Sequence, residues 1–261
     1  MVCLIVLASS GCSVEGGEIF AGSSSEKSSS SSSQDSSEPD APESQGESSD
    51  SEDSSESSQA ETMMAASVEE ADWRLILVNP WNSLPENYYI PLAQSPRSDL
   101  MIDSRINDDL NAMLDDCRAA GYSPYICSAY RDWDTQVYLY EKQVEIWESR
   151  GYSEEEAEAG AATEVAVPGT SEHQLGLALD IVDSNMMILD DSQADTPTQQ
   201  WLMEHCWEYG FILRYPEGKE DITGINYEPW HYRYVGREAA QYITENGITL
   251  EEYLGKSADN H

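Results

Sequence analysis

Basic residues are scarce in this chain of 261 residues. Thirteen Lys and Arg stand against fifty Asp and Glu, so the formal net charge is −37. The acidic excess is not confined to one region: residues 13–70 carry 15 acidic side chains and one Lys, and the rest of the chain carries 35 acidic and 12 basic ones. So acidic a surface repels phosphate backbones and anionic lipid head groups. The composition therefore argues against a nucleic-acid partner and against membrane adhesion through charge.

The chain also has few cysteines, and none of them has metal-binding spacing. Its five cysteines include no Cys-x-x-Cys pair, so a thiolate metal site is not indicated. Cys3 and Cys12 lie in an N-terminal apolar stretch, and the other three (Cys117, Cys127 and Cys206) are an odd number that cannot all pair with one another. We expect these three to be buried, reduced thiols, with a Cys117–Cys127 disulfide as the alternative.

Large apolar residues are almost missing from residues 12–70, which consist mainly of Ser, Glu, Asp, Gln and Gly. A segment with so little apolar surface cannot offset the entropy cost of ordering, so we expect a disordered, acidic, Ser-rich linker. The remaining residues, 71–261, are enough for one well-buried domain. The sequence therefore predicts a short N-terminal segment (1–11), a tether (12–70) and one folded domain.

Residues 1–11 are apolar but too few for a normal membrane-spanning helix. The stretch ends in Ala8-Ser9-Ser10-Gly11-Cys12, a run of small residues before a cysteine. This pattern resembles the lipobox of bacterial lipoprotein signal peptides, with Ser9 where Leu is usual. The resemblance implies cleavage before Cys12, lipidation of Cys12 and anchoring at the outer face of the cell membrane. A truncated ordinary signal peptide and a membrane-spanning stub are the alternatives.

Hydrophobic periodicity predicts helices interleaved with a few strands in the folded domain. One helix is marked by apolar residues at helical spacing, from Ile106 to Cys117, and by a stop at Gly121. Capping and proline signals mark the starts of two more, at Ser153 and Pro197. The helices are expected over residues 104–120, 134–150, 153 to before 168, 197 to before 210, and 238–246. The strands are expected over residues 74–78, 125–128, 176–182, 211–214 and 225–235. Few strands among many helices favour an α+β fold, a small, mainly antiparallel sheet with helices packed around it.

Residues 171–180, SEHQLGLALD, form the stretch with the most information about function. From position 176 onward the pattern is typical of a strand, in which successive side chains face opposite sides. The core face would carry Leu177, Leu179 and Ile181, and the other face Gly176, Ala178 and Asp180. The small residues of that second face would leave open space beside a carboxylate, as a bound ion or substrate requires.

Two of the four histidines lie in dense motifs with a carboxylate nearby: His173 with Asp180, and His231 with Glu228. Another, His205, falls within an expected helix, where packing or a local hydrogen bond would explain it, and the last is the terminal residue. Two imidazoles and one carboxylate form a ligand set suited to catalytic zinc, with a fourth position left for water. A separate carboxylate beside that water can act as a general base.

The spacing of the second motif raises a geometric question. Glu228 and His231 are three residues apart, so in a regular strand they would face opposite sides of the sheet. Pro229, between them, cannot donate a hydrogen bond to a sheet ladder. We therefore predict a kink or turn at Pro229, or a strand that begins only after it.

Together these motifs resemble the VanY-type zinc D-Ala-D-Ala carboxypeptidases. The peptidase group to which they belong also includes the D-Ala-D-Ala dipeptidases, the LD-carboxypeptidases and the N-domain of Hedgehog, whose fold the resemblance implies. It runs from about residue 77 to 255. The matching segments are Leu77-Val-Asn-Pro-Trp81, Ile126-Cys-Ser-Ala-Tyr-Arg131, Val167-Pro-Gly-Thr-Ser-Glu-His173, Ser171-x-His173-x-x-Gly176-x-Ala178-x-Asp180, Glu228-Pro-Trp-His231 and Trp230-His-Tyr-Arg-Tyr-Val-Gly236.

The resemblance implies a role for each residue of the site. His173, Asp180 and His231 would hold one Zn²⁺, and Glu228 would be the catalytic base. Arg131 would act in catalysis and binding, on the terminal carboxylate of the substrate or on the oxyanion of the tetrahedral intermediate. The substrate contacts would come from Arg131, Gln136, Ser171 and Tyr215. A solvated helix position for Gln136 and an ordinary ion pair for Arg131 are the alternatives.

The resemblance implies a zinc-dependent D,D-carboxypeptidase that removes the C-terminal D-alanine from peptidoglycan stem peptides. We expect a monomer outside the cytoplasm, tethered to the membrane through lipid on Cys12 and facing the cell wall. One alternative is an L,D-carboxypeptidase acting on tetrapeptide stems. The other is a non-catalytic, zinc-containing wall-binding module, against which the presence of Glu228 argues, since such a module needs no base.

Overall fold

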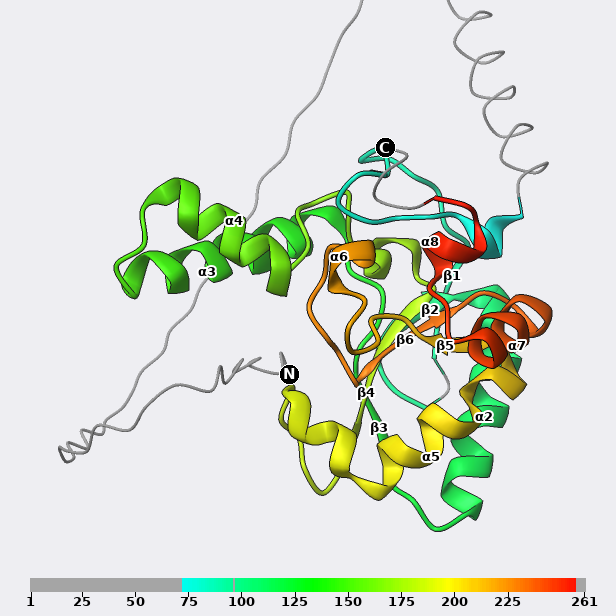
Figure 1. Cartoon of the computed structure of the whole chain (residues 1–261). Helices are drawn as coiled ribbons and strands as arrows, with labels where there is room; N and C mark the ends of the chain where they lie inside the picture. The colour runs from blue at the N-terminus through cyan, green and yellow to red at the C-terminus, as the bar shows by residue number, and fades with distance from the viewer. Residues whose placement is uncertain (1–71, 96, 257–261) are drawn as a thin grey trace, which may run out of the picture. The chain divides into compact units, whose positions relative to one another are not determined.

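The computed structural model describes residues 72–95 and 97–256 of the chain (Figure 1). The predicted signal segment, the predicted linker and Cys12 lie outside the described residues. In the part that is described, no helix is both long and apolar enough to cross a membrane.

Four antiparallel strands form the main sheet of the described part, in the order β3-β4-β6-β5. They are β3 (Pro124–Ser128), β4 (Ala178–Asp183), β5 (Phe211–Leu213) and β6 (His231–Tyr234). A smaller sheet pairs β1 (Leu92–Gln94) with β2 (Met101–Asp103). Every residue of β4 is buried, and the strand lies inside the sheet, between β3 and β6.

The longer helices form two groups around this sheet. One group contains α2 (Asn107–Ala119), α5 (Pro197–His205) and α7 (Arg237–Asn246). The other contains α3 (Trp133–Ser149) and α4 (Glu154–Glu164), which pack on each other and extend away from the sheet (Figure 1). The short helices are α6 (Glu220–Thr223) and α8 (Leu250–Tyr253), with 3-10 turns η1 (Trp73–Leu75), η2 (Ser104–Ile106), η3 (Glu172–Leu175), η4 (Asp191–Asp195) and η5 (Cys206–Tyr209). The α+β prediction, with a small antiparallel sheet and helices around it, is confirmed.

The two faces of β4 separate the core from the site, as alternation predicts. The main core contains Leu177, Leu179 and Ile181, together with residues of α2 and α5 such as Leu114 and Leu202. These side chains are almost fully removed from water, which is the main favourable contribution to folding. The intervening Asp180 lies on the opposite face and lines a pocket.

Gly176 does not belong to the strand, and it does not clear space in the pocket; both predictions were wrong. It ends η3 in the left-handed conformation, with φ +66°. Its carbonyl accepts a hydrogen bond from the amide of Asp103 at 2.9 Å, and a Cβ at this position would lie 2.9 Å from that same nitrogen. A glycine is needed because the backbone turns with positive φ and passes close to β2. Neither it nor Ala178 lines the pocket.

Other differences are local and have identifiable causes. The predicted strand over residues 74–78 begins instead with η1, because the Asp72 side chain accepts a hydrogen bond from the Arg74 amide and caps a 3-10 turn. The helix predicted up to position 210 changes to the 3-10 turn η5 at Cys206. The pair β1–β2 and the helix α6 were not predicted, since three or four residues carry too little periodicity. The capping box at Ser153 is confirmed.

Cys117 and Cys206 are free thiols. Cys117 and Cys206 are buried, and burial raises the pKa of each to about 12, so they remain protonated. Cys127 is half-buried. The alternative of a Cys117–Cys127 disulfide was therefore wrong.

Candidate metal centre and active site

His173, Asp180 and His231 meet at one place, although the sequence separates the first from the last by more than fifty residues. His173 is in η3, Asp180 is in β4, and His231 is the first residue of β6. Asp180 and His231 are register partners across the antiparallel β4–β6 pair, and the turn at Gly176 brings η3 beside them. One ligand atom from each of the three residues lies within 4.8 Å of the others.

The Oδ1 atom of Asp180 occupies the middle of this group. It lies 3.4 Å from Nε2 of His173 and 3.4 Å from Nδ1 of His231. It is buried, and among the described residues it has no hydrogen-bond partner. Leaving such an oxygen unpaired is costly. Two imidazole nitrogens and one carboxylate oxygen directed at one point could hold a divalent metal ion, and they are the donor types of catalytic zinc sites.

In two of these side chains, the polar atom that points away from the group forms a hydrogen bond with a neighbouring residue. Nδ1 of His173 lies 2.7 Å from the carbonyl oxygen of Ala129. Because a carbonyl only accepts, Nδ1 carries the proton and Nε2 is left with its lone pair directed inward. Oδ2 of Asp180 accepts a hydrogen bond from Nη2 of Arg131 at 3.0 Å. The tautomer of His173 and the orientation of Asp180 are therefore set by the protein itself.

Glu228 stands beside the same group, and the predicted break at Pro229 is confirmed. Pro229 and Trp230 form a turn, closed by the amide of His231 donating to the carbonyl of Glu228 at 3.2 Å, and β6 begins only after it. The turn puts Glu228 and His231 on the same side, with Oε2 of the first 3.3 Å from Nδ1 of the second. A carboxylate outside the group of three converging side chains is thus positioned to act on a molecule bound next to them.

Burial and charge set different protonation states for the two histidines. Burial, assisted by the positive charge of Arg131, lowers the pKa of His173 to about 4, so this imidazole is neutral at neutral pH. Burial also opposes the charged form of His231, but Asp180, Glu172 and Glu228 outweigh it and raise its pKa well above 6.5. Without a metal ion, a proton therefore sits on His231 among three carboxylates. A metal cation would have to displace that proton.

The two acids at the centre also differ. Burial by itself would raise the pKa of Asp180, but His173, His231 and Arg131 hold it well below its ordinary value. Burial raises the pKa of Glu228 despite the opposing effect of His231. A carboxylate whose pKa is moved towards neutrality is a stronger base than an ordinary one, which suits a general base.

A pocket opens over this group of residues. Its walls come from α3, the end of α4 and the segment after it, the sheet, and the loops before β6. Of the predicted substrate contacts, Arg131, Ser171 and Tyr215 line it. Gln136 does not: it is fully buried, and its Nε2 donates to the carbonyl of Ala166, which does line the pocket. The alternative of a solvated helix position for Gln136 was therefore wrong, and direct contact with substrate stays a prediction.

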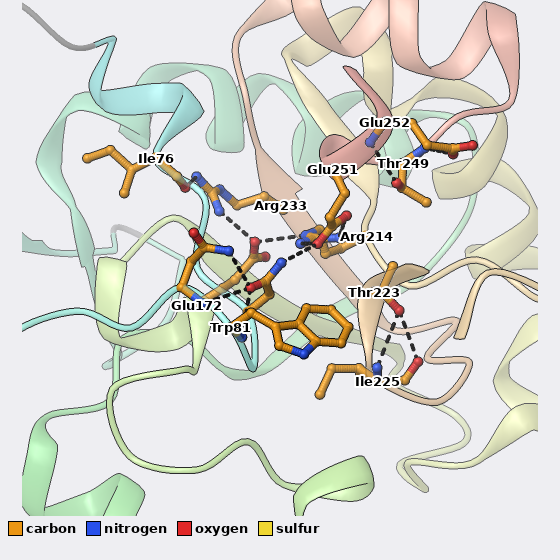
Figure 2. A network of polar contacts seen from close by, with 12 residues as sticks. Ile76, Trp81, Glu172, Arg214, Thr223, Ile225, Arg233, Thr249, Glu251 and Glu252 are labelled. Carbon is orange, nitrogen blue, oxygen red and sulfur yellow. Dashed lines mark hydrogen bonds and ion pairs between the residues drawn. The ribbon is translucent and has the colours of Figure 1, made fainter. Parts of the chain in front are cut away.

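One acidic residue beside the ligands was not predicted. Glu172 precedes His173, is fully buried, and contacts Arg214 and Arg233 (Figure 2). Its other oxygen, Oε2, lies 3.6 Å from Nε2 of His231. A sequence signal did exist: two arginines occur within or next to apolar strand segments, and buried guanidinium groups require buried carboxylates.

A family model and a protein of known name both match this chain, and both are described as D-alanyl-D-alanine carboxypeptidases. The family model described as VanY, D-alanyl-D-alanine carboxypeptidase, matches residues 99–237. A D-alanyl-D-alanine carboxypeptidase of Enterococcus faecalis is 43% identical over 197 residues, which cover 74% of this chain and 71% of the relative.

Two solved structures are similar in both fold and sequence. A vancomycin-resistance D,D-pentapeptidase VanY mutant in complex with Zn(II) matches with a TM-score of 0.64 and 44% identity, over 70% of this chain and 99% of the other. The LdcB LD-carboxypeptidase matches with a TM-score of 0.61 and 38% identity, over 69% of this chain and 85% of the other. Since the family model matches more than half of the chain, and a relative of known name is aligned over most of its length, the chain belongs to the VanY D-alanyl-D-alanine carboxypeptidase family.

Proposed function

We propose that this protein is a zinc-dependent D,D-carboxypeptidase that removes the C-terminal D-alanine from peptidoglycan stem peptides. The observation that carries the proposal is the convergence of His173, Asp180 and His231 on one point, with Glu228 beside them in a pocket. The names of the relatives supply the substrate class.

The three inward atoms fit zinc in number and type. The Oδ1 atom of Asp180, buried and unpaired among the described residues, is the strongest sign that a cation belongs there. We assign Nε2 of His173, Oδ1 of Asp180 and Nδ1 of His231 as the ligand atoms. Zinc held by these atoms would lower the pKa of a bound water molecule to about 7 and would polarise the carbonyl of the scissile bond.

Glu228 is the proposed general base. Its carboxylate takes a proton from the attacking water and later delivers a proton to the amine of the leaving D-alanine. Its place outside the ligand set leaves both oxygens available for this transfer. The turn at Pro229 matters because it directs Glu228 to the same side as His231.

Arg131 is the proposed electrostatic partner of the substrate. Its Nε donates to Ser128 and its Nη2 to Asp180, and Nη1 makes no hydrogen bond to the described residues. The guanidinium plane is held by two contacts while one nitrogen remains for the substrate carboxylate or the oxyanion. Ser171 and Tyr215, which line the pocket, are the proposed contacts for the C-terminal end of the substrate, and Gln136 supports the wall through Ala166.

A second candidate function is L,D-carboxypeptidase activity on tetrapeptide stems, which the likeness to LdcB favours. The ligands and base would be the same, and only the fit of the pocket to the substrate would differ. Mass spectrometry of purified protein with pentapeptide and tetrapeptide stems, with and without a chelator, separates the candidates. Loss of one alanine from the pentapeptide alone supports the D,D assignment, and loss from the tetrapeptide supports the L,D one. Absence of cleavage in zinc-loaded protein would favour a wall-binding module.

The proposed setting is the outer face of the cell membrane. Residues 1–11 would be a lipoprotein signal, Cys12 the lipidated residue, residues 12–70 a tether and residues 71–261 a monomeric catalytic domain. Support comes from the cysteine that follows a small-residue run and from the Ser-rich acidic composition that comes after it. Replacement Cys12→Ser should prevent fatty-acid labelling and move the protein from the membrane fraction to the soluble one. Unchanged labelling would contradict the anchor.

A further inference from the structure

Four charged side chains form a cluster in the interior, next to the proposed metal centre. We call it the buried ion cluster: Glu172, Arg214, Arg233 and Glu251, two carboxylates and two guanidinium groups, all with fully buried side chains (Figure 2). Its opposite charges balance. Ion pairs as deep as this contribute little net stability, because removing the charges from water offsets their attraction. Its position therefore calls for a reason other than stability.

The two carboxylates of the cluster are used differently. Both carboxylate oxygens of Glu251 accept hydrogen bonds from Arg214, in a bidentate pair with N–O distances of 2.6 and 2.9 Å. Glu172 instead accepts from both arginines through Oε1 alone, at 2.8 Å from Arg214 and 2.6 Å from Arg233. If neutralising the arginines were its whole role, the two-oxygen geometry of Glu251 would be expected here too.

The second oxygen of Glu172 faces His231. Oε2 lies 3.6 Å from Nε2 of His231, and neither atom has a hydrogen-bond partner among the described residues. Both are buried. Two unpaired polar atoms that face each other in the interior are a donor and an acceptor slightly beyond hydrogen-bond distance, and a small side-chain movement would join them.

We propose that Glu172 is a positioning residue for His231: its Oε2 accepts the Nε2 proton of that imidazole and so keeps the Nδ1 lone pair directed at the metal centre. This rests on the proposed function only in taking His231 as a metal ligand. Glu172 would then do for His231 what the Ala129 carbonyl does for His173 and the Arg131 guanidinium does for Asp180. An acidic partner also makes the ligating nitrogen more basic.

The cluster also explains how Glu172 is kept in place. Arg233 donates to the carbonyls of Arg74 and Ile76, near the start of the described domain. Glu251 is in α8, near the end of the described domain, and its Oε1 accepts a hydrogen bond from the side-chain amide of Asn79 at 3.1 Å. Both ends of the described domain therefore meet behind Glu172, so that its carboxylate cannot turn away from His231 without breaking ion pairs.

The test compares Glu172→Gln with Glu251→Gln in the full chain. Both substitutions remove one carboxylate from the same cluster, but only Glu172 faces His231. Zinc affinity is measured by chelator competition, and the geometry of the centre by the visible absorption spectrum of the Co²⁺-substituted protein. We expect Glu172→Gln to weaken zinc binding by about 10–100-fold and to change the Co²⁺ spectrum. We expect Glu251→Gln to lower the melting temperature of the metal-free protein and to leave the spectrum unchanged.

Equal zinc affinity and identical spectra in Glu172→Gln and the unsubstituted protein would overturn the proposal, as would equal losses in both variants. If Glu172→Gln does not fold, Glu172→Asp serves instead: it keeps the charge, withdraws the oxygen by one methylene, and should weaken zinc binding and alter the spectrum while remaining folded. A normal spectrum in that variant also overturns the proposal. If the unsubstituted protein binds metal but cleaves no stem peptide, the proposed function fails while the metal-binding comparison still decides the role of Glu172.

Discussion

Asp180 and His231 are opposite each other in the register of β4 and β6, and Oδ1 of Asp180 lies 3.4 Å from Nδ1 of His231. A pair of neighbouring antiparallel strands thus supplies two of the three proposed zinc ligands from directly paired positions. Side chains at such positions are close together on one face of the sheet. The third proposed ligand, His173, comes from η3, outside the sheet.

Removing the central ligand should abolish metal binding. Asp180→Asn keeps the shape of the side chain but removes the charge that the two histidines and a cation share. We expect zinc affinity to fall by more than about 100-fold, which is more than the loss of a residue that only hydrogen-bonds to a metal ligand usually causes. Turnover should fall in parallel. Asp183→Asn, on the same strand but bonded to Thr198 and Asn185, is the matched control. Normal zinc affinity in Asp180→Asn would contradict the ligand assignment.

Replacing the proposed base should separate binding from chemistry. Glu228→Gln cannot accept a proton from water, so we expect kcat to fall by about 10²–10⁴-fold while the stoichiometry of bound zinc stays at one. Single-turnover assays with a pentapeptide stem and metal analysis of the same sample give both readouts. Glu164→Gln removes another carboxylate that lines the pocket and should keep most activity. A zinc-loaded Glu228→Gln protein with undiminished kcat would sink the proposed mechanism.

Zinc affinity should depend on pH through one histidine. In the metal-free protein, neighbouring carboxylates overcome burial and raise the pKa of His231 well above 6.5, whereas the pKa of His173 lies near 4. Below the raised pKa of His231, zinc must displace one proton, so apparent affinity should fall about tenfold for each pH unit as the pH is lowered through that range. Chelator competition across that range measures the slope. A flat profile would mean that His231 is already neutral in the metal-free protein.

Acid should destabilise the metal-free protein in part through Glu172. Burial alone would raise the pKa of this carboxyl, but Arg214 and Arg233 outweigh it and lower the pKa below its ordinary value of 4.5. Because the folded-state pKa is depressed, its contribution to stability is present above pH 4.5 and is lost as pH falls through the folded-state pKa. Urea denaturation at several acidic pH values should show a shallower loss of the free energy of unfolding in Glu172→Gln. Equal slopes in both proteins would contradict this.

The sequence alone was sufficient to predict the backbone placement of residues that lie in dense local motifs. Strand alternation correctly placed Asp180 opposite the core-facing Leu179, and the position of Pro229 correctly predicted a turn between Glu228 and His231. These inferences succeeded because they depend on backbone geometry within a few residues. The same local reasoning failed at Gly176, whose conformation is set by contact with Asp103, more than seventy residues earlier in the chain.

By itself, then, the sequence determined the class of fold, since periodicity and capping are local properties of the chain. The roles proposed for the site residues came from the resemblance of their motifs to a known family. Only the tertiary structure decided which atoms of those ligands point inward, where the pocket opens, and that Glu172 faces His231. The reason is distance along the chain: Glu172 meets Arg214 and Arg233 across 42 and 61 residues. No local pattern encodes such contacts, because they form only when segments far apart in the sequence pack against one another.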